Sequence, residues 1–532
     1  MPNPTSAEII ALRLYEAGVR HAFGVPGGEV LELIDAMERI GIRFVLARHE
    51  NAAGFMAEGA WHATGAPGVL VATVGPGMAN TVNVTANAEQ DRVPLIVITG
   101  AYDDVTTLRY THQIFDHRAV LKPVVKASFE ARAGACDVMI DKAVRIAQDP
   151  QPGPVHIDLP VKVAAAEHPV PGVGYLTPVS PSLPTGLDAA RRRLANAKRP
   201  LIVAGLDLLQ SPGAPEAVRA AAEAHGIPVV TTYKAKGVLD ERHPLSLGGH
   251  GLSPKSDAIL MPLIGEADLV ICAGYDPIEM RTGWQDPWDR ANAISFTAVP
   301  DRQAMHGVSQ GWVCDPGRSL EALFDGLALS VDWGARVAET RAALDAAFAP
   351  GDDWGPAQAL AILDRMRPGE MMTSVDSGAH RILMSQMWHC DRPHTLIQST
   401  GLCTMGCALP LAMGHGLASG ERSLAVMGDG CLDMILGELA TLRDTAAPVI
   451  CTVLNDSSLA LIEMKQRRDG KQNAGVDFGA TDYAAVAGAM GLKSLKADSA
   501  ASLEETFAEA LAADGPVLLE ITIPRRSYDG LI

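Results

Sequence analysis

The chain has 532 residues and a formal net charge of −18; 48% of its residues are hydrophobic and 20% are charged. At about 100 to 200 residues per domain, this length predicts roughly three domains. The acidic balance repels polyanions, so neither nucleic acid nor an anionic membrane surface is expected as a partner, and no apolar run approaches the ~18 residues of a membrane span.

Short apolar runs alternate with helical patterns in the first third of the chain. Strands are predicted at residues 44–47, 69–74 and 95–100, and a helix is predicted over residues 50–64 that ends at Gly65. This alternation is typical of a parallel sheet covered by helices. A domain over residues 1–168 is therefore predicted, followed by a linker over residues 169–186, where Pro, Gly and Ser are frequent and no periodicity is visible.

The alternation continues in two further blocks. Strands at 201–205, 229–232 and 269–274 predict a central Rossmann-like domain over residues 187–335, which lacks the G-x-G-x-x-G pattern of a dinucleotide site. Strands at 424–430, 449–456 and 517–523 predict a third domain over residues 350–532. The predicted fold class is α/β, with three Rossmann-like or flavodoxin-like domains on parallel sheets, and the first and third could share one fold.

The eight cysteines include no C-x-x-C pair, and a chain of this size does not need disulfides for stability. They are expected to be reduced and mostly buried. The N-terminal sequence shows no basic region followed by an apolar run, so a cytoplasmic protein is expected.

Two acidic strand ends stand out in the third block. One predicted strand ends in Gly428-Asp429-Gly430 and is followed by a helix expected from Cys431 onward, and the next strand ends in Asn455-Asp456. Glycines at a strand-to-helix turn let backbone amides approach a phosphate, and neighbouring parallel strands bring both carboxylates to one sheet edge. Paired carboxylates beside a diphosphate suit Mg²⁺. A lone GDG would more simply be a turn, but the second acid favours a metal site.

These motifs resemble those of the thiamine-diphosphate-dependent 2-oxo acid decarboxylases and carboligases, and within that family the acetohydroxyacid (acetolactate) synthase large subunits. The resemblance covers nearly the whole chain and implies that the first and third domains are thiamine-diphosphate-binding folds. It also implies that Asp429 and Asp456 are side-chain ligands of Mg²⁺ and that Ser458 supplies its backbone carbonyl. The family usually has Asn where this chain has Asp456, so the site gains a negative charge.

The segment GLCTMGCALPLAMG at residues 401–414 resembles the family's GLGTMG-x-x-LP-x-A-x-G. It implies that Met405 is wedged between the two cofactor rings and that Cys403 offers its carbonyl to the pyrimidine amino group. The remaining cofactor contacts that the resemblance implies are Ser377, Gly378, Ala379, His380, Gly428, Gly430 and Cys431. Taken alone, Met405 would more simply be a core residue.

The segment RHENAAGFMAEGAWHATG at residues 48–65 resembles the family's RHE-x-x-A-x-x-MA-x-G pattern, in which the glutamate binds the pyrimidine ring nitrogen. Here that residue is Glu50, whose carboxyl in an apolar pocket would share a proton with the ring and so activate the cofactor. Without the resemblance, Glu50 would be an acid favoured by the helix dipole. In the family, the first domain faces the third domain of a partner, which implies a homodimer or homotetramer with active sites at the subunit interface.

Substrate residues are predicted from weaker matches. FGVPGGEV at residues 23–30 is similar to the synthase loop in which Gly27 and Gly28 leave room beside the reacting carbon. YTHQIFDH at residues 110–117 aligns with a family segment carrying Phe-Gln-Glu, so that Gln113 matches the glutamine and His112 replaces the phenylalanine. His112 or His117 is a candidate proton relay. A hydrogen-bonded loop histidine is an equally good interpretation of each.

AGYDPIEMRTGWQDPW at residues 273–288 resembles the catabolic, flavin-free acetolactate synthases more than the biosynthetic ones, so FAD is not expected. Arg281 is a candidate for holding the carboxylate of a second substrate, or else a surface residue. Ile462 and Lys465, after the second metal strand, are further substrate candidates. Lys465 stands near the position of a Trp in the biosynthetic enzymes and suggests a wide pocket for an acidic or unusual 2-oxo acid.

The predicted function is a thiamine-diphosphate- and Mg²⁺-dependent carboligase that decarboxylates pyruvate or a similar 2-oxo acid and condenses the two-carbon unit with a carbonyl acceptor. The alternatives are a non-oxidative decarboxylase similar to benzoylformate decarboxylase and a carbon–carbon lyase on the same cofactor. A non-catalytic homologue is a further alternative, but it would have no chemical need for Glu50.

Overall fold

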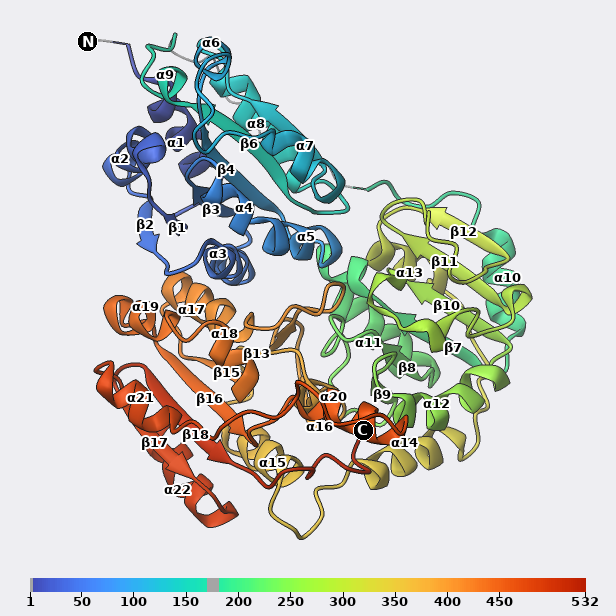
Figure 1. Ribbon diagram of the computed structural model, residues 1–532. Coiled ribbons are helices and arrows are strands. Elements are labelled where there is room, and N and C mark those ends of the chain that lie inside the picture. The colour runs from blue at the N-terminus through green and yellow to red at the C-terminus, as the bar shows by residue number, and fades with distance from the viewer. Residues whose placement is uncertain (1–2, 170–180) are drawn as a thin grey trace.

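The computed structural model describes residues 3–169 and 181–532, so most of the predicted linker lies outside the described residues. It contains three parallel sheets of six strands, one in each third of the chain (Figure 1). The predicted α/β class is therefore confirmed. No helix in the described ranges is long and apolar enough to cross a membrane.

The N-terminal sheet has the strand order β2-β1-β3-β4-β6-β5. Its strands are β1 (His21–Val25), β2 (Arg43–Leu46), β3 (Gly68–Ala72), β4 (Leu95–Ala101), β5 (Ala127–Glu130) and β6 (Val155–Pro160). The accompanying helices are α1 (Ser6–Glu16), α2 (Leu31–Ile40), α3 (Glu50–Thr64), α4 (Pro76–Asn80), α5 (Val82–Gln90), α6 (Asp104–Thr107), α7 (His117–Leu121), α8 (Cys136–Ala147) and α9 (Val161–Ala164).

The central sheet has the order β12-β11-β10-β7-β8-β9, which is the doubly wound arrangement of a Rossmann fold. Its strands are β7 (Pro200–Ala204), β8 (Val229–Thr231), β9 (Ser246–Gly249), β10 (Leu269–Ala273), β11 (Ala293–Thr297) and β12 (Gln310–Val313). Its helices are α10 (Asp188–Asn196), α11 (Ala214–His225), α12 (Pro254–Glu266) and α13 (Pro316–Phe324), and α14 (Arg336–Ala347) follows the unit.

The C-terminal sheet has the order β14-β13-β15-β16-β18-β17, which repeats the N-terminal order strand for strand. Its strands are β13 (Thr373–Val375), β14 (Leu396–Gln398), β15 (Ser423–Gly428), β16 (Val449–Asn455), β17 (Lys493–Ala497) and β18 (Val517–Thr522). Its helices are α15 (Pro356–Met366), α16 (Ala379–Met387), α17 (Ala408–Ser419), α18 (Asp429–Met434), α19 (Glu438–Thr445), α20 (Ala460–Arg468), α21 (Tyr483–Ala489) and α22 (Ala500–Leu511). The similarity suspected from sequence is thus present in the topology.

Continuous apolar runs form the central strands because both faces of a parallel sheet are covered by helices. Strands β3 and β16 are buried along their whole length, and each lies within two residues of the predicted segment. The predicted helix over residues 50–64 is α3, and it ends where Gly65 adopts the left-handed conformation with φ 73°.

Helices α3 and α17 join the N-terminal and C-terminal units through a very close backbone contact. A Cβ atom on Gly59 would lie 2.1 Å from the Leu411 carbonyl oxygen, and one on Gly414 would lie 1.8 Å from that of Met56. Only glycine fits at either position. The contact belongs to one hydrophobic core shared by both units.

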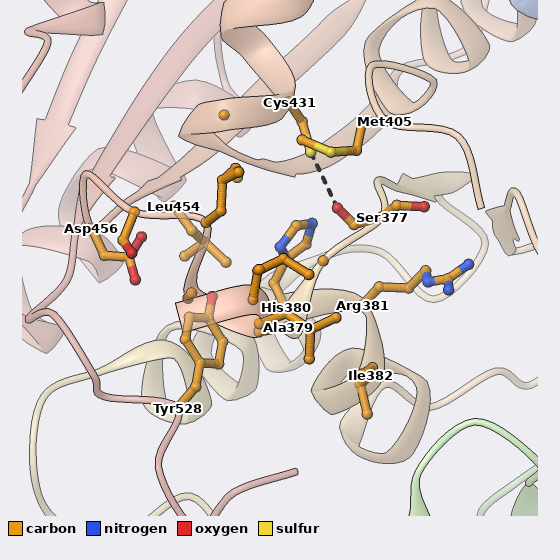
Figure 2. A pocket seen from close by; sticks show the side chains of 18 of the residues that line it. Ser377, Ala379, His380, Arg381, Ile382, Met405, Cys431, Leu454, Asp456 and Tyr528 are labelled. Atoms are coloured by element: carbon orange, nitrogen blue, oxygen red, sulfur yellow. Dashed lines mark hydrogen bonds between the residues drawn. The ribbon is translucent and has the colours of Figure 1, made fainter. Parts of the chain in front are cut away.

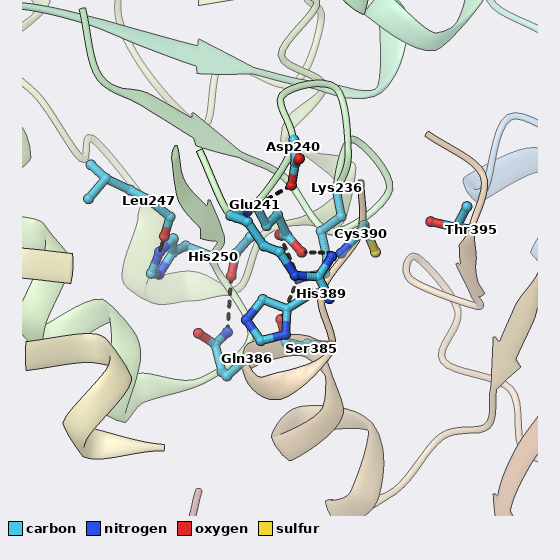
Figure 3. A network of polar contacts seen from close by, with 12 residues as sticks. Lys236, Asp240, Glu241, Leu247, His250, Ser385, Gln386, His389, Cys390 and Thr395 are labelled. Atoms are coloured by element: carbon cyan, nitrogen blue, oxygen red, sulfur yellow. Dashed lines mark hydrogen bonds and ion pairs between the residues drawn. The ribbon is translucent and has the colours of Figure 1, made fainter. Parts of the chain in front are cut away.

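A buried polar network joins the central unit to the C-terminal unit (Figure 3). Lys236 donates from Nζ to Glu241 Oε1 at 2.7 Å and to the Ser385 carbonyl at 3.0 Å. Glu241 Oε2 accepts the backbone N–H of Cys390 at 2.8 Å. Ser385 lies on α16, and Cys390 follows that helix. The ion pair between Lys236 and Glu241 therefore fixes a loop of the central unit against α16, which borders the candidate site.

Candidate active site

A cavity of about 230 Å³ opens at the carboxyl edge of the C-terminal sheet (Figure 2). It combines the loops after β13, β15 and β16 with α16, α20, the chain end and one residue of the central unit. Its lining residues are Arg281, Ser377, Gly378, Ala379, His380, Arg381, Ile382, Cys403, Met405, Gly428, Asp429, Gly430, Cys431, Leu454, Asp456, Ser458, Leu459, Ala460, Leu461, Ile462 and Tyr528.

The two predicted metal-binding carboxylates meet in this cavity. Strands β15 and β16 pair in parallel with Gly428 opposite Leu454, which places the residues that follow each strand side by side. Asp429 Oδ2 accepts the backbone N–H groups of Asp456 at 3.0 Å and Ser457 at 2.6 Å. Helix α18 begins at Asp429, two residues earlier than predicted, because the glycine-flanked turn closes directly into the helix.

The acidic end of the cavity suits a divalent cation. Burial raises the pKa of Asp429 to about 6, and burial together with the Asp429 charge raises the pKa of Asp456 to about 7. Asp456 Oδ2 is buried and has no hydrogen-bond partner among the described residues. An orphaned carboxylate oxygen beside a second carboxylate is the kind of hard-oxygen donor set that Mg²⁺ binds. Ser458 lies next to them and is buried.

The loop after β13 forms the middle of the cavity. The Cys431 thiol donates to the Ser377 carbonyl at 3.2 Å, which ties this loop to α18. Ser377 Oγ and His380 Nε2 are buried without partners in the part of the chain that the structure describes. Burial lowers the pKa of His380 to about 3, so its ring is neutral and able to donate one hydrogen bond. Two free polar groups beside backbone amides fit a phosphate group.

Asp376 organises this loop and was not predicted from the sequence. Its buried carboxylate accepts the N–H groups of Ser377 at 2.8 Å, Gly406 at 2.9 Å and Ala408 at 3.1 Å. It thereby fixes the loop after β13 to the turn that carries Met405. The only sequence signal was an acid after a three-residue strand, which is too short to be distinguished from a loop.

Met405 and Cys403 both line the cavity, as the resemblance implies. Cys403 adopts the left-handed conformation with φ 57°, where glycine would be unstrained, and its side chain is exposed. The other seven cysteines are buried, so the prediction of mostly buried thiols is confirmed.

Glu50 lies apart from the cavity. It is the first residue of α3, and its Oε2 accepts a hydrogen bond from Asn80 Nδ2 at 2.9 Å. His49 caps the helix by accepting the N–H of Asn51 at 3.1 Å. Glu50 is 6% exposed and is not among the residues that line the cavity. One chain therefore assembles the carboxylate pair with its loops but leaves Glu50 elsewhere.

Four other predicted residues of the N-terminal unit also lie away from the cavity. Gly27 packs against Thr73, where a Cβ atom would be 2.2 Å from the hydroxyl oxygen, whereas Gly28 is open. Gln113 has φ 61° and, like His112, is exposed. These residues and Glu50 all belong to the N-terminal unit, and none of them lines the cavity.

His117 is buried and fully engaged. Its Nε2 accepts the N–H of Gly75 at 3.2 Å, and its Nδ1 lies 2.8 Å from Asp158 Oδ1. Because both ring nitrogens are used within the N-terminal unit, the interpretation of His117 as a structural loop histidine is the better one.

Two of the three remaining substrate candidates line the cavity. Arg281 reaches it from the central unit, and Ile462 from α20, where its side chain is 43% exposed. Lys465, one turn further along α20, is exposed and does not line the cavity. Arg381 and Tyr528 also line it, although neither was predicted from the sequence.

Three parallel sheets, two of them alike, and a carboxylate pair beside a glycine-flanked loop define a cofactor-binding α/β enzyme. The chain belongs to the thiamine pyrophosphate enzymes: the family's N-terminal TPP binding domain matches residues 4–120, its central domain matches residues 187–323, and its C-terminal TPP binding domain matches residues 376–521. Thiamine pyrophosphate and thiamine diphosphate are the same cofactor, so the predicted family and cofactor are confirmed.

Several curated relatives are acetolactate synthases. The acetolactate synthase of Bacillus subtilis (strain 168) is 29% identical over 537 residues, covering 97% of this chain and 93% of the relative. The acetolactate synthase isozyme 1 large subunit of Escherichia coli (strain K12) is 29% identical over 548 residues, covering 98% and 94%. A probable acetolactate synthase large subunit of Methanococcus aeolicus is 29% identical over 556 residues, covering 97% and 92%.

Proposed function

We propose that the protein is an acetolactate synthase-like carboligase, which decarboxylates pyruvate or a similar 2-oxo acid and joins the remaining two-carbon unit to a carbonyl acceptor. The observation that carries the proposal is the meeting of Asp429 and Asp456 in a cavity whose other walls match the cofactor segments of this family. The nearly full-length similarity to acetolactate synthases supports the same reaction.

In this proposal, Asp429, Asp456 and the carbonyl of Ser458 bind Mg²⁺, and His380 and Ser377 donate hydrogen bonds to the cofactor diphosphate. Gly378, Ala379, Gly428, Gly430 and Cys431 line the same stretch of the cavity and leave room for the backbone amides to approach. Met405 and Cys403 border the pyrimidine end. When bound, thiamine diphosphate accepts the electron pair that remains as carbon dioxide leaves.

Glu50 is proposed to come from a second subunit. Its carboxylate is bonded to Asn80 and lies outside the cavity of its own chain, so a partner's N-terminal unit would have to complete the site. Large apolar side chains are exposed on both units that would meet: Leu31 is 57% and Leu46 45% exposed in the N-terminal unit, and Met434 is 65% exposed at the end of α18, whose first residues line the cavity. Exposed apolar groups of this size are typical of an interface.

The partner's N-terminal unit would also bring Gly27, Gly28, Gln113 and His112 to the reacting atoms. Glu50 would hold the proton that activates the cofactor, and Gln113 and His112 would bind or protonate the substrate oxygen. Arg281 and Ile462 would bind the acceptor at the mouth of the cavity. Lys465, although exposed in one chain, would lie at the rim of this interface.

The test is to incubate the protein with thiamine diphosphate, Mg²⁺ and a panel of 2-oxo acids, and to follow carbon dioxide while products are identified by mass spectrometry. Acetolactate or another hydroxyketone with loss of carbon dioxide is expected. Free aldehyde alone would replace the carboligase with a simple decarboxylase, and the absence of carbon dioxide from every acid would refute both.

We further propose that the domain boundaries lie at residues 168, 187, 335 and 350, that the protein does not bind FAD, and that it is cytoplasmic. The eight free thiols are what a reducing compartment requires.

A further inference from the structure

Arg381 is a buried cation without an anion. It lies on α16, is 3% exposed and lines the cofactor cavity. Its Nη1 donates to the Ser399 carbonyl and its Nη2 to the Cys403 thiol at 3.1 Å, while Nε is buried with no partner in the described ranges. All of these contacts are with uncharged groups.

The other buried arginines of the described chain show how unusual this is. Each of the three forms an ion pair with a carboxylate, at 2.7 to 2.9 Å: Arg13 with Glu16, Arg92 with Asp276 and Arg367 with Asp364. Burying a charge without a counter-charge is strongly unfavourable, so this chain balances its buried guanidinium groups everywhere except at Arg381. The exception faces the cofactor cavity.

The acidic and basic side chains of the cavity lie on opposite sides of it. In Figure 2, Asp456 lies on one side and the Arg381 side chain extends to the opposite side, with His380 between them. A divalent cation on Asp429 and Asp456 would neutralise the acidic end, and the neutral ring of His380 adds no charge. The diphosphate carries negative charge of its own but is assigned to Ser377 and His380, whereas the guanidinium of Arg381 contacts Ser399 and Cys403, at the end of the cavity proposed for the pyrimidine ring.

A fixed cation such as Arg381 does not hinder decarboxylation only if the group that it binds keeps its negative charge through the transition state. The carboxylate of the donor leaves as neutral carbon dioxide, so an arginine paired with it would stabilise the substrate more than the transition state. The acceptor's carboxylate is already assigned to the exposed Arg281 at the mouth. The group left for Arg381 is a second acidic group on the donor.

We propose that Arg381 is a specificity-determining residue that binds the distal carboxylate of a dicarboxylic 2-oxo acid donor. This rests on the proposed function, because it names the donor class of that same reaction. Its guanidinium offers the free Nε–H and rearranges one Nη contact to form paired hydrogen bonds with the carboxylate.

The first test compares 2-oxoglutarate with 2-oxobutyrate, which lacks the distal carboxylate, as donors for the holoenzyme and for Arg381→Gln and Arg381→Lys. The ratio of the two kcat/KM values should favour 2-oxoglutarate in the unmodified protein. Losing a hydrogen-bonded charge should lower that ratio about 10- to 100-fold in Arg381→Gln, with partial recovery in Arg381→Lys. The exposed Arg318 supplies the control, since Arg318→Gln should leave the ratio unchanged.

The second test does not need turnover. Glutarate, an unreactive dicarboxylate, should bind the thiamine-diphosphate- and Mg²⁺-loaded protein by calorimetry, and Arg381→Gln should weaken that binding about 10- to 100-fold relative to butyrate. Equal glutarate affinity in both proteins would overturn the inference. So would an equal loss of kcat/KM for both donors, which would assign Arg381 to supporting the loop of Ser399 and Cys403. Absence of decarboxylation alongside selective glutarate binding would refute the proposed function instead.

Discussion

The N-terminal and C-terminal units have the same strand order but differ at the ends of their strands. After β15 and β16, the C-terminal unit carries Asp429 and Asp456. At this sheet edge the backbone N–H of Asp456 donates to the carboxylate of Asp429. After β3, the corresponding strand of the N-terminal unit, the chain instead continues into Thr73, whose hydroxyl donates to Glu29 Oε2 at 2.6 Å. The topology is shared, whereas the chemistry of the strand ends is not.

The comparison teaches that the fold does not determine which unit binds the metal. Both sheets present loops at their carboxyl edges, but within the described ranges it is the C-terminal loops that combine paired carboxylates with unpartnered polar groups in one cavity. The N-terminal unit contributes an acid, Glu50, at the start of a helix. In the proposed function, these two copies of one architecture are complementary halves of one site, so that each half can be disabled separately.

The largest effect is expected from Glu50→Gln. Removing the acid that handles the proton should lower kcat about 100- to 10,000-fold while thiamine diphosphate still binds, because the metal half is untouched. Steady-state kinetics and a fluorescence titration of the cofactor check both parts. The exposed Glu32 gives the matched control, since Glu32→Gln should keep full activity. Substantial turnover by Glu50→Gln would remove the N-terminal half from the mechanism.

Asp429→Asn should disable the other half. Without one metal ligand, the dissociation constant of the Mg²⁺–thiamine diphosphate complex should rise about 10- to 100-fold by calorimetry. Asp433, exposed on the same helix and bonded to the Tyr483 hydroxyl at 2.9 Å, supplies the control substitution Asp433→Asn. Unchanged cofactor binding in Asp429→Asn would refute the metal site.

The central unit should affect stability rather than chemistry. Glu241→Gln leaves the charge of Lys236 buried without its partner, which should destabilise the protein by about 3–5 kcal/mol. Urea denaturation should show a lower midpoint for the first transition. A double variant, Lys236→Met with Glu241→Gln, should recover much of the loss; if it is no more stable than the single variant, burial of the lysine charge is not the cause.

The last effect is expected at the contact between the two similar units and is seen only as a dependence on pH. Glu58 on α3 is 1% exposed, and burial raises its pKa to about 8. Since the folded state retains a proton that the unfolded state loses above about pH 4.5, Glu58 makes the protein less stable as the pH rises from 5 to 8. In Glu58→Gln, the melting temperature should fall less steeply over this range. An unchanged pH dependence would show that Glu58 ionises normally.

The sequence predicted those features that leave a local pattern. The interior strands β3, β4, β10 and β16 are long apolar runs. The glycines on both sides of Asp429 predict the turn in which that residue lies. The edge strand β5 is only half buried along its length and gives no such run. Asp376 and Arg381 could not be found, because their importance lies in contacts with residues 18 to 32 positions further along the chain.

The separation of Glu50 from the carboxylate pair leads to the most direct test, which is complementation between subunits. Glu50→Gln and Asp429→Asn are co-expressed in equal amounts with different affinity tags, and the mixed assemblies are assayed for carbon dioxide release at a cofactor concentration too low to load the Asp429→Asn site. If one subunit supplies Glu50 and its partner supplies Asp429, half of the sites in each mixed dimer are intact, and about a quarter to a half of the normal activity should return. Activity no higher than that of the separate variants would contradict a site shared between subunits.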